Sequence, residues 1–426
     1  MNKDVMGVQE VSPGYGFVAE NPAVPVGYKQ TEVGVIPEDW EIFPFGEHFS
    51  IYAGGDAPKH SLSSTQSDRH PYPVFANAIQ GKGLYGFTAE TRSKPDSVTV
   101  TARGYLGHAE YRSEPFFPIV RLLVLEPKGT LDSKYTSYAI NDRVQFSIES
   151  TGVPQLTAPQ VARYAVAAPP DVKEQKAIAT ALSDVDALLE ELDRLIAKKR
   201  DIKQAAMQQL LTGETRLPGF EGKWDSRSLL QIADSQKALF DDGDWVEAEH
   251  ITDQGIRLVQ TGNIGEGVFV DKATKKYIYD ASFEKLRCKE LKQGDILICR
   301  LAEPAGRACV FPDIGENRAI TSVDVTIFRP RPEVADRQYL VQYFSTSDWF
   351  KMVLDHVGGT THKRISRGAL GKLKVPFPPI EEQKAIAEIL SDIDTEIQAL
   401  EHRRSKTAEL KQGMMQELLT GRTRLV

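Results

Sequence analysis

One segment of the chain occurs twice, and the second copy begins 208 residues after the first. Residues 174–217 align with residues 382–425 without a gap, and 23 of the 44 positions are identical. The identities cluster at both ends of the segment, in EQKAIA and LSD at its start and in LLTG and TRL at its end. Near-identical ends favour one duplicated structural unit over two unrelated stalks or homodimer zippers.

Apolar residues in both copies recur at alternating steps of four and three residues. This spacing places them in a stripe on one side of a helix, which is typical of helices that pack along their length. The stripe consists of Ile178, Leu182, Val185, Leu189, Leu192 and Ile196 in the first copy and of Ile386, Leu390, Ile393, Ile397 and Leu400 in the second. We therefore expect two long helices that pair with one another.

Prolines and glycines mark the limits of both helices. Pro169-Pro170 and Pro378-Pro379 precede the two copies, and a helix does not continue through such a pair. Gly213 and Gly421 follow the last apolar residues, where glycine commonly ends a helix. A helix over residues 174–212 would be about 60 Å long at the usual rise per residue.

The similarity between the two halves extends beyond the helices. Val166 and Val375 precede the two proline pairs at matching distances, and Trp40 and Trp224 each open a globular region. The sequence predicts a tail over 1–36, either disordered or packed on a partner, a globular domain over 37–168 and a helix over 169–217. A second globular domain over 218–377 and a second helix over 378–426 complete the pattern.

Both globular regions are rich in short runs of β-forming residues separated by Gly, Pro, Asn and Asp. Strand-type runs cover 97–104, 117–127, 294–301 and 322–330, and residues 336–355 have a helical pattern. We expect α+β domains, each with a curved and mostly antiparallel sheet. Because the two domains share their placement but little sequence, we infer a common scaffold that presents two different recognition surfaces.

Net charge is distributed unevenly along the chain. The total is −7, yet residues 41–168 carry 12 Lys/Arg against 12 Asp/Glu, and residues 225–377 carry 22 against 22. Each domain is therefore neutral overall and leaves room for a local basic surface. The sequence contains no signal-peptide pattern and no long apolar run, so we expect a cytoplasmic protein without a membrane span.

Motifs for catalysis and metal binding are missing from the sequence. We find no dinucleotide-binding or phosphate-binding glycine motif, no nucleophile elbow, no HExxH and no CxxC. Cys288, Cys299 and Cys309 lack the spacing of zinc ligands, so we expect free and mostly buried thiols. The sequence therefore predicts no catalytic centre, no metal site and no cofactor in this chain.

Polar residues in glycine-rich loops are the remaining candidates for function. Asn and Gln pair with adenine, Arg and Lys pair with guanine, and basic loops contact phosphates. The same residues are also common in ordinary turns and solvated loops. The candidates for DNA contact are Asn77, Gln80, Lys82, Arg103, Gln260, Asn263, Arg300, Arg307, Lys363, Arg364 and Arg367.

The arrangement resembles the specificity subunits of type I restriction-modification systems. The resemblance covers nearly the whole chain beyond the tail. It rests on GVIPEDW before the first domain, VAAPPDVKEQKAIA and VPFPPIEEQKAIA after the two domains, and LLTGETRLPGF and LLTGRTRL after the two helices. TAEL at 407–410 is similar to a short element that some members repeat in the central helix.

The resemblance implies two target-recognition domains and two helices that pair antiparallel as a coiled coil. Each domain would read one half of a bipartite sequence in double-stranded DNA, and the helices would set the unread spacer. Two methyltransferase subunits, which bind S-adenosylmethionine, would dock on the helices. Restriction subunits that use ATP and Mg²⁺ would join the complex, and this chain would carry no active site of its own.

Two other classes of protein remain open at this stage. One is a coiled-coil scaffold protein whose domains bind peptides, which would not show salt-dependent binding to DNA. The other is a standalone DNA-modifying enzyme with an unfamiliar site, which clustered carboxylates beside a lysine would favour.

Overall fold

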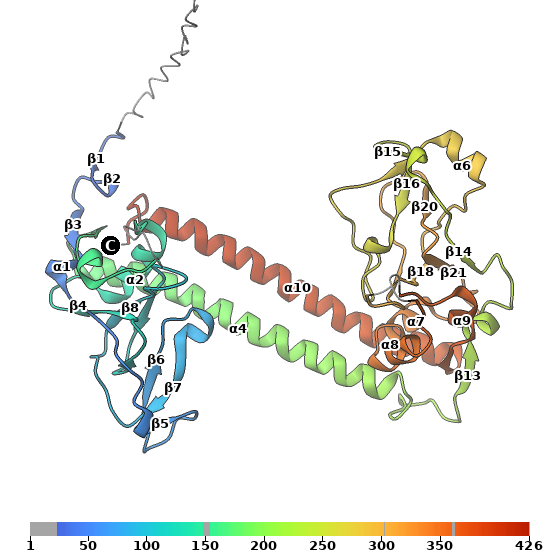
Figure 1. The fold of residues 1–426 in the computed structure, drawn as a ribbon, viewed down its shortest axis with the longest axis horizontal. Helices are drawn as coiled ribbons and strands as arrows, with labels where there is room; N and C mark the ends of the chain where they lie inside the picture. Colours follow the sequence, from blue (N-terminus) through green and yellow to red (C-terminus); the bar gives the residue numbers. More distant parts are fainter. Residues whose placement is uncertain (1–23, 148–153, 302, 360–362, 426) are drawn as a thin grey trace, which may run out of the picture. The chain divides into compact units, whose positions relative to one another are not determined.

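The computed structural model describes residues 24–147, 154–301, 303–359 and 363–425. Its contacts divide the chain into two compact units. Unit 1 comprises residues 1–190 together with 405–426, and unit 2 comprises residues 191–404. Figure 1 shows both units and the two long helices, α4 (Val172–Leu210) and α10 (Ile380–Leu418), which each contribute to both.

Unit 1 contains two four-stranded sheets and a two-stranded frame. The first sheet has the order β4-β11-β8-β9, the second has the order β10-β6-β7-β5, and β3 pairs with β12 to form the frame. The strands are β3 (Glu41–Pro44), β4 (Phe49–Ala53), β5 (Leu62–Ser63), β6 (Tyr72–Phe75), β7 (Leu84–Thr88), β8 (Ser97–Val100), β9 (Ala109–Arg112), β10 (Phe117–Pro118), β11 (Leu123–Pro127) and β12 (Ala165–Ala168). The helices and 3-10 turns are α1 (Phe45–His48), η1 (Lys59–Ser61), η2 (Gln80–Gly83), α2 (Ser133–Arg143) and α3 (Ala158–Val161).

Unit 2 repeats the topology of these three sheets strand for strand. Its sheets have the orders β14-β21-β18-β19 and β15-β17-β16-β20, and β13 pairs with β22. Among the described residues, the sheet pairings of each unit are antiparallel except one, which is β6 with β10 in unit 1 and β16 with β20 in unit 2. The strands are β13 (Asp225–Ser228), β14 (Phe240–Asp242), β15 (Ile251–Thr252), β16 (Ile256–Val259), β17 (Tyr277–Ile278), β18 (Ile296–Cys299), β19 (Ala308–Val310), β20 (Ala319–Thr321), β21 (Val325–Phe328) and β22 (Lys374–Phe377). The helices and 3-10 turns are α5 (Leu229–Ile232), η3 (Ala248–His250), η4 (Thr261–Asn263), α6 (Asp280–Leu286), α7 (Arg337–Tyr343), α8 (Ser347–Leu354) and α9 (Arg367–Lys372).

The predicted α+β class is confirmed, and the central strands show why the sequence forms it. Every residue of β8 and of β18 is buried, and both strands are rich in β-branched or apolar side chains, which suit a sheet covered on both faces. In each unit a helix packs near this sheet and begins with an aspartate cap. Asp132 accepts the amide of Tyr135 at 2.8 Å, and Asp336 accepts the amide of Tyr339 at 2.8 Å.

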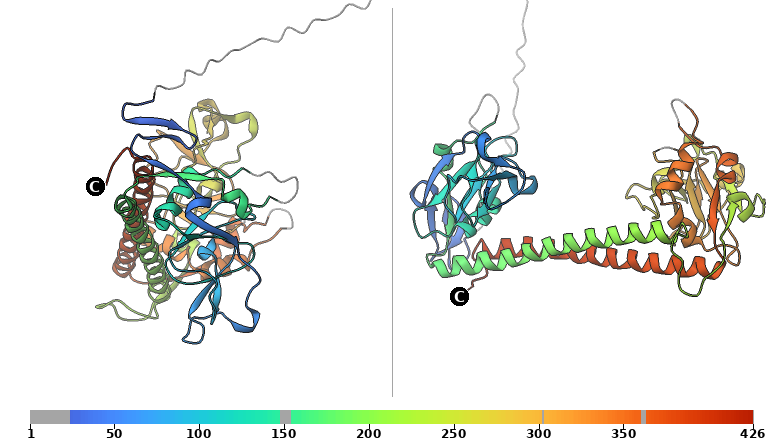
Figure 2. Two further views of the ribbon diagram at one scale, coloured as in Figure 1. Left: turned by 90° about the vertical axis from the view of Figure 1, so that its left-hand side faces the viewer. Right: turned by 90° about the horizontal axis from the view of Figure 1, so that it is seen from below.

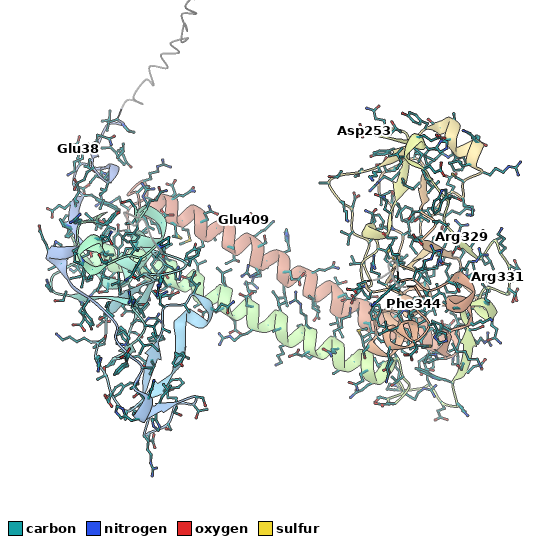
Figure 3. The ribbon with its side chains drawn as sticks, viewed as in Figure 1. Glu38, Asp253, Arg329, Arg331, Phe344 and Glu409 are labelled. Atoms are coloured by element: carbon teal, nitrogen blue, oxygen red, sulfur yellow. The ribbon has the colours of Figure 1, made fainter. Side chains whose placement is uncertain are left out.

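Two of the predicted continuous runs are interrupted in the structure. Residues 117–127 form two strands, β10 and β11, with a turn over 119–122 between them. Residues 336–355 form two helices, because the side chain of Thr346 accepts the amide of Trp349 at 3.3 Å and starts α8 anew. The labelled Phe344 of Figure 3 lies at this break, where its ring packs on Trp349 with the centroids 4.4 Å apart.

The two long helices run antiparallel in each unit, as predicted. In unit 2, Lys203 pairs with Asp394 at 2.6 Å and Arg200 pairs with Glu401 at 2.5 Å, so that the residue numbers rise on one helix as they fall on the other. In unit 1, Lys411 pairs with Asp186 at 2.7 Å and Arg424 pairs with Glu174 at 2.6 Å, so the numbers again rise on one segment as they fall on the other. Figure 2 shows the helices side by side.

The predicted helix-pairing residues differ in how deeply they are buried. Three residues in the middle of the helices are buried, namely Leu192, Ile196 and Ile397. Four others are half-buried, namely Val185, Leu189, Ile393 and Leu400. Ile178 and Leu182 join the hydrophobic core of the unit 1 domain, and Ile386 and Leu390 join that of unit 2. The start of each helix therefore anchors it to its own domain. The helix-pairing role of the full set stays a prediction.

The matched tryptophans, Trp40 and Trp224, each lie against the glycine that follows a long helix. A Cβ added to Gly421 would lie 3.0 Å from the ring of Trp40, and one added to Gly213 would lie 3.1 Å from the ring of Trp224. Both glycines also have positive φ, 68° and 75°, where other residues are strained. The end of each long helix is therefore fitted against the tryptophan that opens a globular domain.

Part of the predicted tail is structured. β1 (Tyr28–Thr31) and β2 (Gly34–Pro37) form an antiparallel hairpin, and the Tyr28 hydroxyl donates to the carbonyl of Gly421 at 3.4 Å. The segment from 28 to 37 thus packs on the chain itself. Residues 1–23, which the tail prediction also covers, lie outside the described residues.

Within the described ranges, no helix combines the length and the apolar character needed to cross a membrane. The three cysteines are free and buried.

Candidate nucleic-acid interface

Three loops of unit 1 meet at one edge of its sheets. Because β6 and β10 are parallel, the segments that follow them, residues 76–83 and 119–122, leave the sheet at the same edge. Asn77 fastens the first of these to the β8–β9 loop: its amide nitrogen donates to the carbonyl of Arg103 at 2.6 Å, and its oxygen accepts the amide of Ala102 at 2.6 Å. The loops are therefore held together as one surface.

The same two loops are joined in unit 2 by a different residue. Arg307, in the β18–β19 loop, donates to the carbonyls of Thr261 and Ile264 at 3.0 and 2.7 Å, which lie in the β16–β17 loop. It also donates to the carbonyls of Leu301 and Pro304 at 3.2 and 2.8 Å. The side-chain amide of Asn77 in unit 1 and the guanidinium of Arg307 in unit 2 thus hold equivalent pairs of loops together.

Several predicted DNA-contact residues form hydrogen bonds within the protein. Asn263 is buried and donates to the carbonyl of Val270 at 2.8 Å, while its oxygen accepts the amide of Gln260 at 2.9 Å. Arg300 is buried and donates to the carbonyls of Val323 and Ile365 at 2.6 and 3.2 Å. These groups, like those of Asn77 and Arg307, position loops, and any contact that they make with bases stays a prediction.

Two further candidates form ion pairs. Lys82 pairs with Glu190 of α4 at 2.6 Å, and this hydrogen bond raises the pKa of Lys82 above its usual value. Arg367, at the start of α9, pairs with Asp241 and lies 3.9 Å from Asp242. Both cations are therefore balanced by carboxylates of their own unit.

Gln260 is half-buried directly after β16, and the remaining four candidates are exposed. Gln80 lies on η2, and Arg103 lies in the β8–β9 loop. Lys363 and Arg364 lie in the segment before α9, where Arg364 approaches Asp324 at 3.4 Å while more than half of its side chain stays exposed. These four side chains are available to a ligand in the structure as it stands.

The sequence analysis missed two exposed residues on the same edge of unit 1. Val120 and Arg121 occupy the turn between β10 and β11, and Arg121 donates to the side chain of Gln155 at 2.8 Å. The run FPIVRLLVLEP had indicated one continuous strand, which concealed the turn. The lone arginine among its apolar residues was the available signal.

The structure therefore defines a duplicated two-domain protein, in which one topology presents two different sets of loops. The family described as "Type I restriction modification DNA specificity domain" matches residues 37–199 and 222–411. Because these matches cover most of the chain, the chain belongs to that family.

Relatives and solved structures agree with this assignment. The MjaVIII type I restriction enzyme specificity subunit of Methanocaldococcus jannaschii is 25% identical over 411 residues, which cover 92% of this chain and 94% of the relative. The putative MjaX type I specificity subunit of the same organism is 25% identical over 430 residues, covering 93% and 97%. The crystal structure of a type I restriction-modification S subunit from M. genitalium shares the fold with a TM-score of 0.62 at 15% identity, covering 89% and 96%.

Proposed function

We propose that this chain is the DNA specificity subunit of a type I restriction-modification complex, with each unit reading one half of a bipartite target. One observation carries the proposal: unit 2 repeats the strand order of unit 1 while the residues in its edge loops differ. A repeated scaffold with different loops is what two half-sites of different sequence require.

The proposed boundaries of the two domains are those expected from the sequence. We propose that residues 37–168 and 218–377 are the two target-recognition domains and that the helical segments 169–217 and 378–426 join them. The exposed Gln80, Arg103, Lys363 and Arg364 are the proposed base or phosphate contacts from the predicted set. Catalysis would belong to other subunits, so S-adenosylmethionine, ATP and Mg²⁺ would bind there and not to this chain.

The two helices offer equivalent places for two copies of a partner. Ile202 and Leu410 occupy matching positions of the repeat, and 44% and 59% of their surfaces are exposed. Single exposed apolar side chains are normal on protein surfaces, so the support for a docking site is that both copies of the repeat expose one at the same position. We propose that one methyltransferase subunit docks at each position, and that restriction subunits join the resulting complex.

Reconstitution tests the proposal directly. The chain would be purified alone and together with its methyltransferase partner subunits, and binding to DNA carrying the methylated motif would be measured at several salt concentrations. Since both domains are neutral, we expect weak binding by the isolated chain and specific, salt-dependent binding by the complex. Binding that is indifferent to both sequence and salt would instead favour the peptide-binding scaffold.

A further inference from the structure

The β10–β11 turn of unit 1 has an unusual backbone. Val120 and Arg121 are consecutive residues with positive φ, 48° and 60°. This region is unfavourable for any residue with a Cβ and especially for a β-branched one such as valine. Both residues are exposed, and 59% of the Val120 surface is open to solvent. The turn therefore combines backbone strain with an apolar side chain in water.

Neighbouring backbone holds the turn in this conformation. The amide of Val120 donates to the carbonyl of Gly55 at 2.8 Å, and the amide of Arg121 donates to that of Gly54 at 3.3 Å. Gly54 in turn donates to the carbonyl of Leu122 at 2.7 Å. A Cβ on Gly54 would lie 2.7 Å from the carbonyl carbon of Pro118, so only glycine permits this approach. Strain that is imposed from outside in this way is typical of functional turns.

Arg121 and the exposed Arg103 are connected through Gln155. Nη1 of Arg121 donates to Oε1 of Gln155 at 2.8 Å, and Gln155 forms a backbone bridge with Arg103. Tyr105, two residues further along, is 69% exposed. Gln155 therefore holds the guanidinium of Arg121 through its side chain and the backbone of Arg103 through its own backbone, and the two arginines come from two different loops.

The equivalent turn of unit 2 differs in length and charge. Residues 322–324 join β20 to β21, one residue fewer than the 119–122 segment between β10 and β11. The turn contains Asp324, which approaches Arg364 at 3.4 Å, and no arginine. Within one shared topology, this turn is thus a place where the two units present different chemistry.

We propose that the Val120–Arg121 turn is a base-reading element of unit 1, with Arg121 and Arg103 donating to guanine and Val120 contacting a thymine methyl group. A guanidinium matches the paired acceptors of guanine, and small apolar side chains recognise the thymine methyl. The hydrogen bonds to Gly54 and Gly55 hold the backbone of the turn with both side chains exposed, and a preformed turn lowers the ordering cost of binding. This inference rests on the proposed function and assigns the residues through which unit 1 would act.

Substitution of Arg121 in the assembled methyltransferase complex tests the proposal. Arg121→Ala is expected to relax one position of the unit 1 half-site, lowering discrimination there about 10-fold to 100-fold and leaving the other half-site and the spacer unchanged. Arg121→Lys is expected to relax it in part, because the lysine ammonium can reach the guanine acceptors but lacks the rigid planar fork of arginine. A variant that weakens binding to all sequences alike, with lysine restoring it, would show a phosphate contact and overturn the proposal.

Arg69→Ala is the matched control. Arg69 is an exposed arginine in the segment before β6, which leaves the opposite end of that strand from residues 76–83. We expect the Arg69→Ala complex to methylate the same motif as the wild type. If the Arg121→Ala complex also methylated the wild-type motif, the proposal would be overturned. A wild-type complex that methylates no bipartite motif would overturn the proposed function instead.

Val120→Gly separates reading from folding. Glycine accepts positive φ, so we expect a melting temperature no lower than that of the wild type. We also expect a weaker preference for thymine at one position of the same half-site, by about 5-fold or more. A stable variant with an unchanged motif would remove Val120 from the reading element.

Discussion

Arg424 and Glu174, 250 residues apart in the sequence, form a paired salt bridge in unit 1. Nε and Nη2 of Arg424 donate to the two carboxylate oxygens at 2.6 and 2.7 Å. Arg216 and Glu382 repeat this geometry in unit 2, with both bonds at 2.7 Å. The end of one helix is thus locked to the start of the other in each unit, and the four residues occupy matching positions of the repeat.

Removal of the arginine from this lock should destabilise unit 1. Arg424→Ala would leave the buried carboxylate of Glu174 without its cation, and breaking a buried pair from one side costs about 3 kcal/mol. Urea unfolding would measure the loss, followed by the fluorescence of Trp40 in a variant whose other tryptophans are replaced by phenylalanine.

Arg422→Ala provides the control for this measurement. Arg422 lies two residues away, is 64% exposed and pairs only loosely with Glu417, at 3.8 Å. Its removal should cost less than about 0.5 kcal/mol. Equal stability of the Arg424→Ala and Arg422→Ala variants would mean that the Arg424–Glu174 salt bridge contributes nothing to the free energy of unfolding.

The residues that fasten the edge loops should affect one half-site each. Asn77→Ala removes both bonds between the 76–83 segment and the β8–β9 loop, so we expect relaxed reading of the unit 1 half-site only. Arg307→Ala should do the same for the unit 2 half-site. A library of bipartite targets randomised in one half at a time would measure both effects, with the exposed Arg331→Ala as a control. Relaxation of both halves by one variant would contradict independent reading.

The length of the helices should set the spacer. α4 and α10 have 39 residues each. Four residues added to each helix would lengthen the pair by about 6 Å, which is about 2 base pairs of DNA. We expect the methylated motif to keep both half-sites and to gain about 2 unread positions. A motif with its original spacer length would show that the helices do not set the spacer.

Charged residues on the exposed helix faces should block the docking of partners. Ile202→Glu and Leu410→Glu are each expected to remove one methyltransferase subunit from the complex, and the double variant to remove both, as seen by native mass spectrometry. Gln204→Glu and Gln412→Glu introduce the same charge at exposed matching positions and should leave assembly intact. Full occupancy in the double variant would place the docking surface elsewhere.

The three thiols should be unreactive in the native protein. Burial raises the pKa of Cys288 to about 11 and of Cys309 to about 12, and it also raises the pKa of Cys299. Because the thiolate is the reactive form, almost none is present at pH 8. Ellman's reagent should therefore detect the thiols only after addition of guanidinium chloride. A thiol that reacts at once in the native state would show that unit 2 opens readily.

The helical frame could be predicted because it depends on local pattern. The spacing of Ile178 and Leu182, the double prolines and the final glycines each act within a few residues, and α4 begins and ends two residues before the expected helix over 174–212. The duplication also revealed the equivalence of Trp40 and Trp224, because both stand at matching places relative to the repeats.

The reading surface could not be predicted in the same way, because it depends on contacts between distant segments. The sequence placed Arg300 and Arg307 among the candidates for DNA contact, yet both donate hydrogen bonds to carbonyl groups of distant segments. Arg121 looked like part of a strand, because the sequence does not show that Gly54 and Gly55 hold the chain in a turn there. Residue type indicated the chemistry, and only the fold decided which side chains stay exposed.

The most direct test of the account is a map of N6-methyladenine in host DNA, with the gene for this chain intact and deleted. We predict that deletion removes methylation from one bipartite motif, with two half-sites separated by an unread spacer, and that reintroducing the gene restores it. Methylation that is identical in both strains, in cells that express the chain and its partner subunits, would contradict the proposed role.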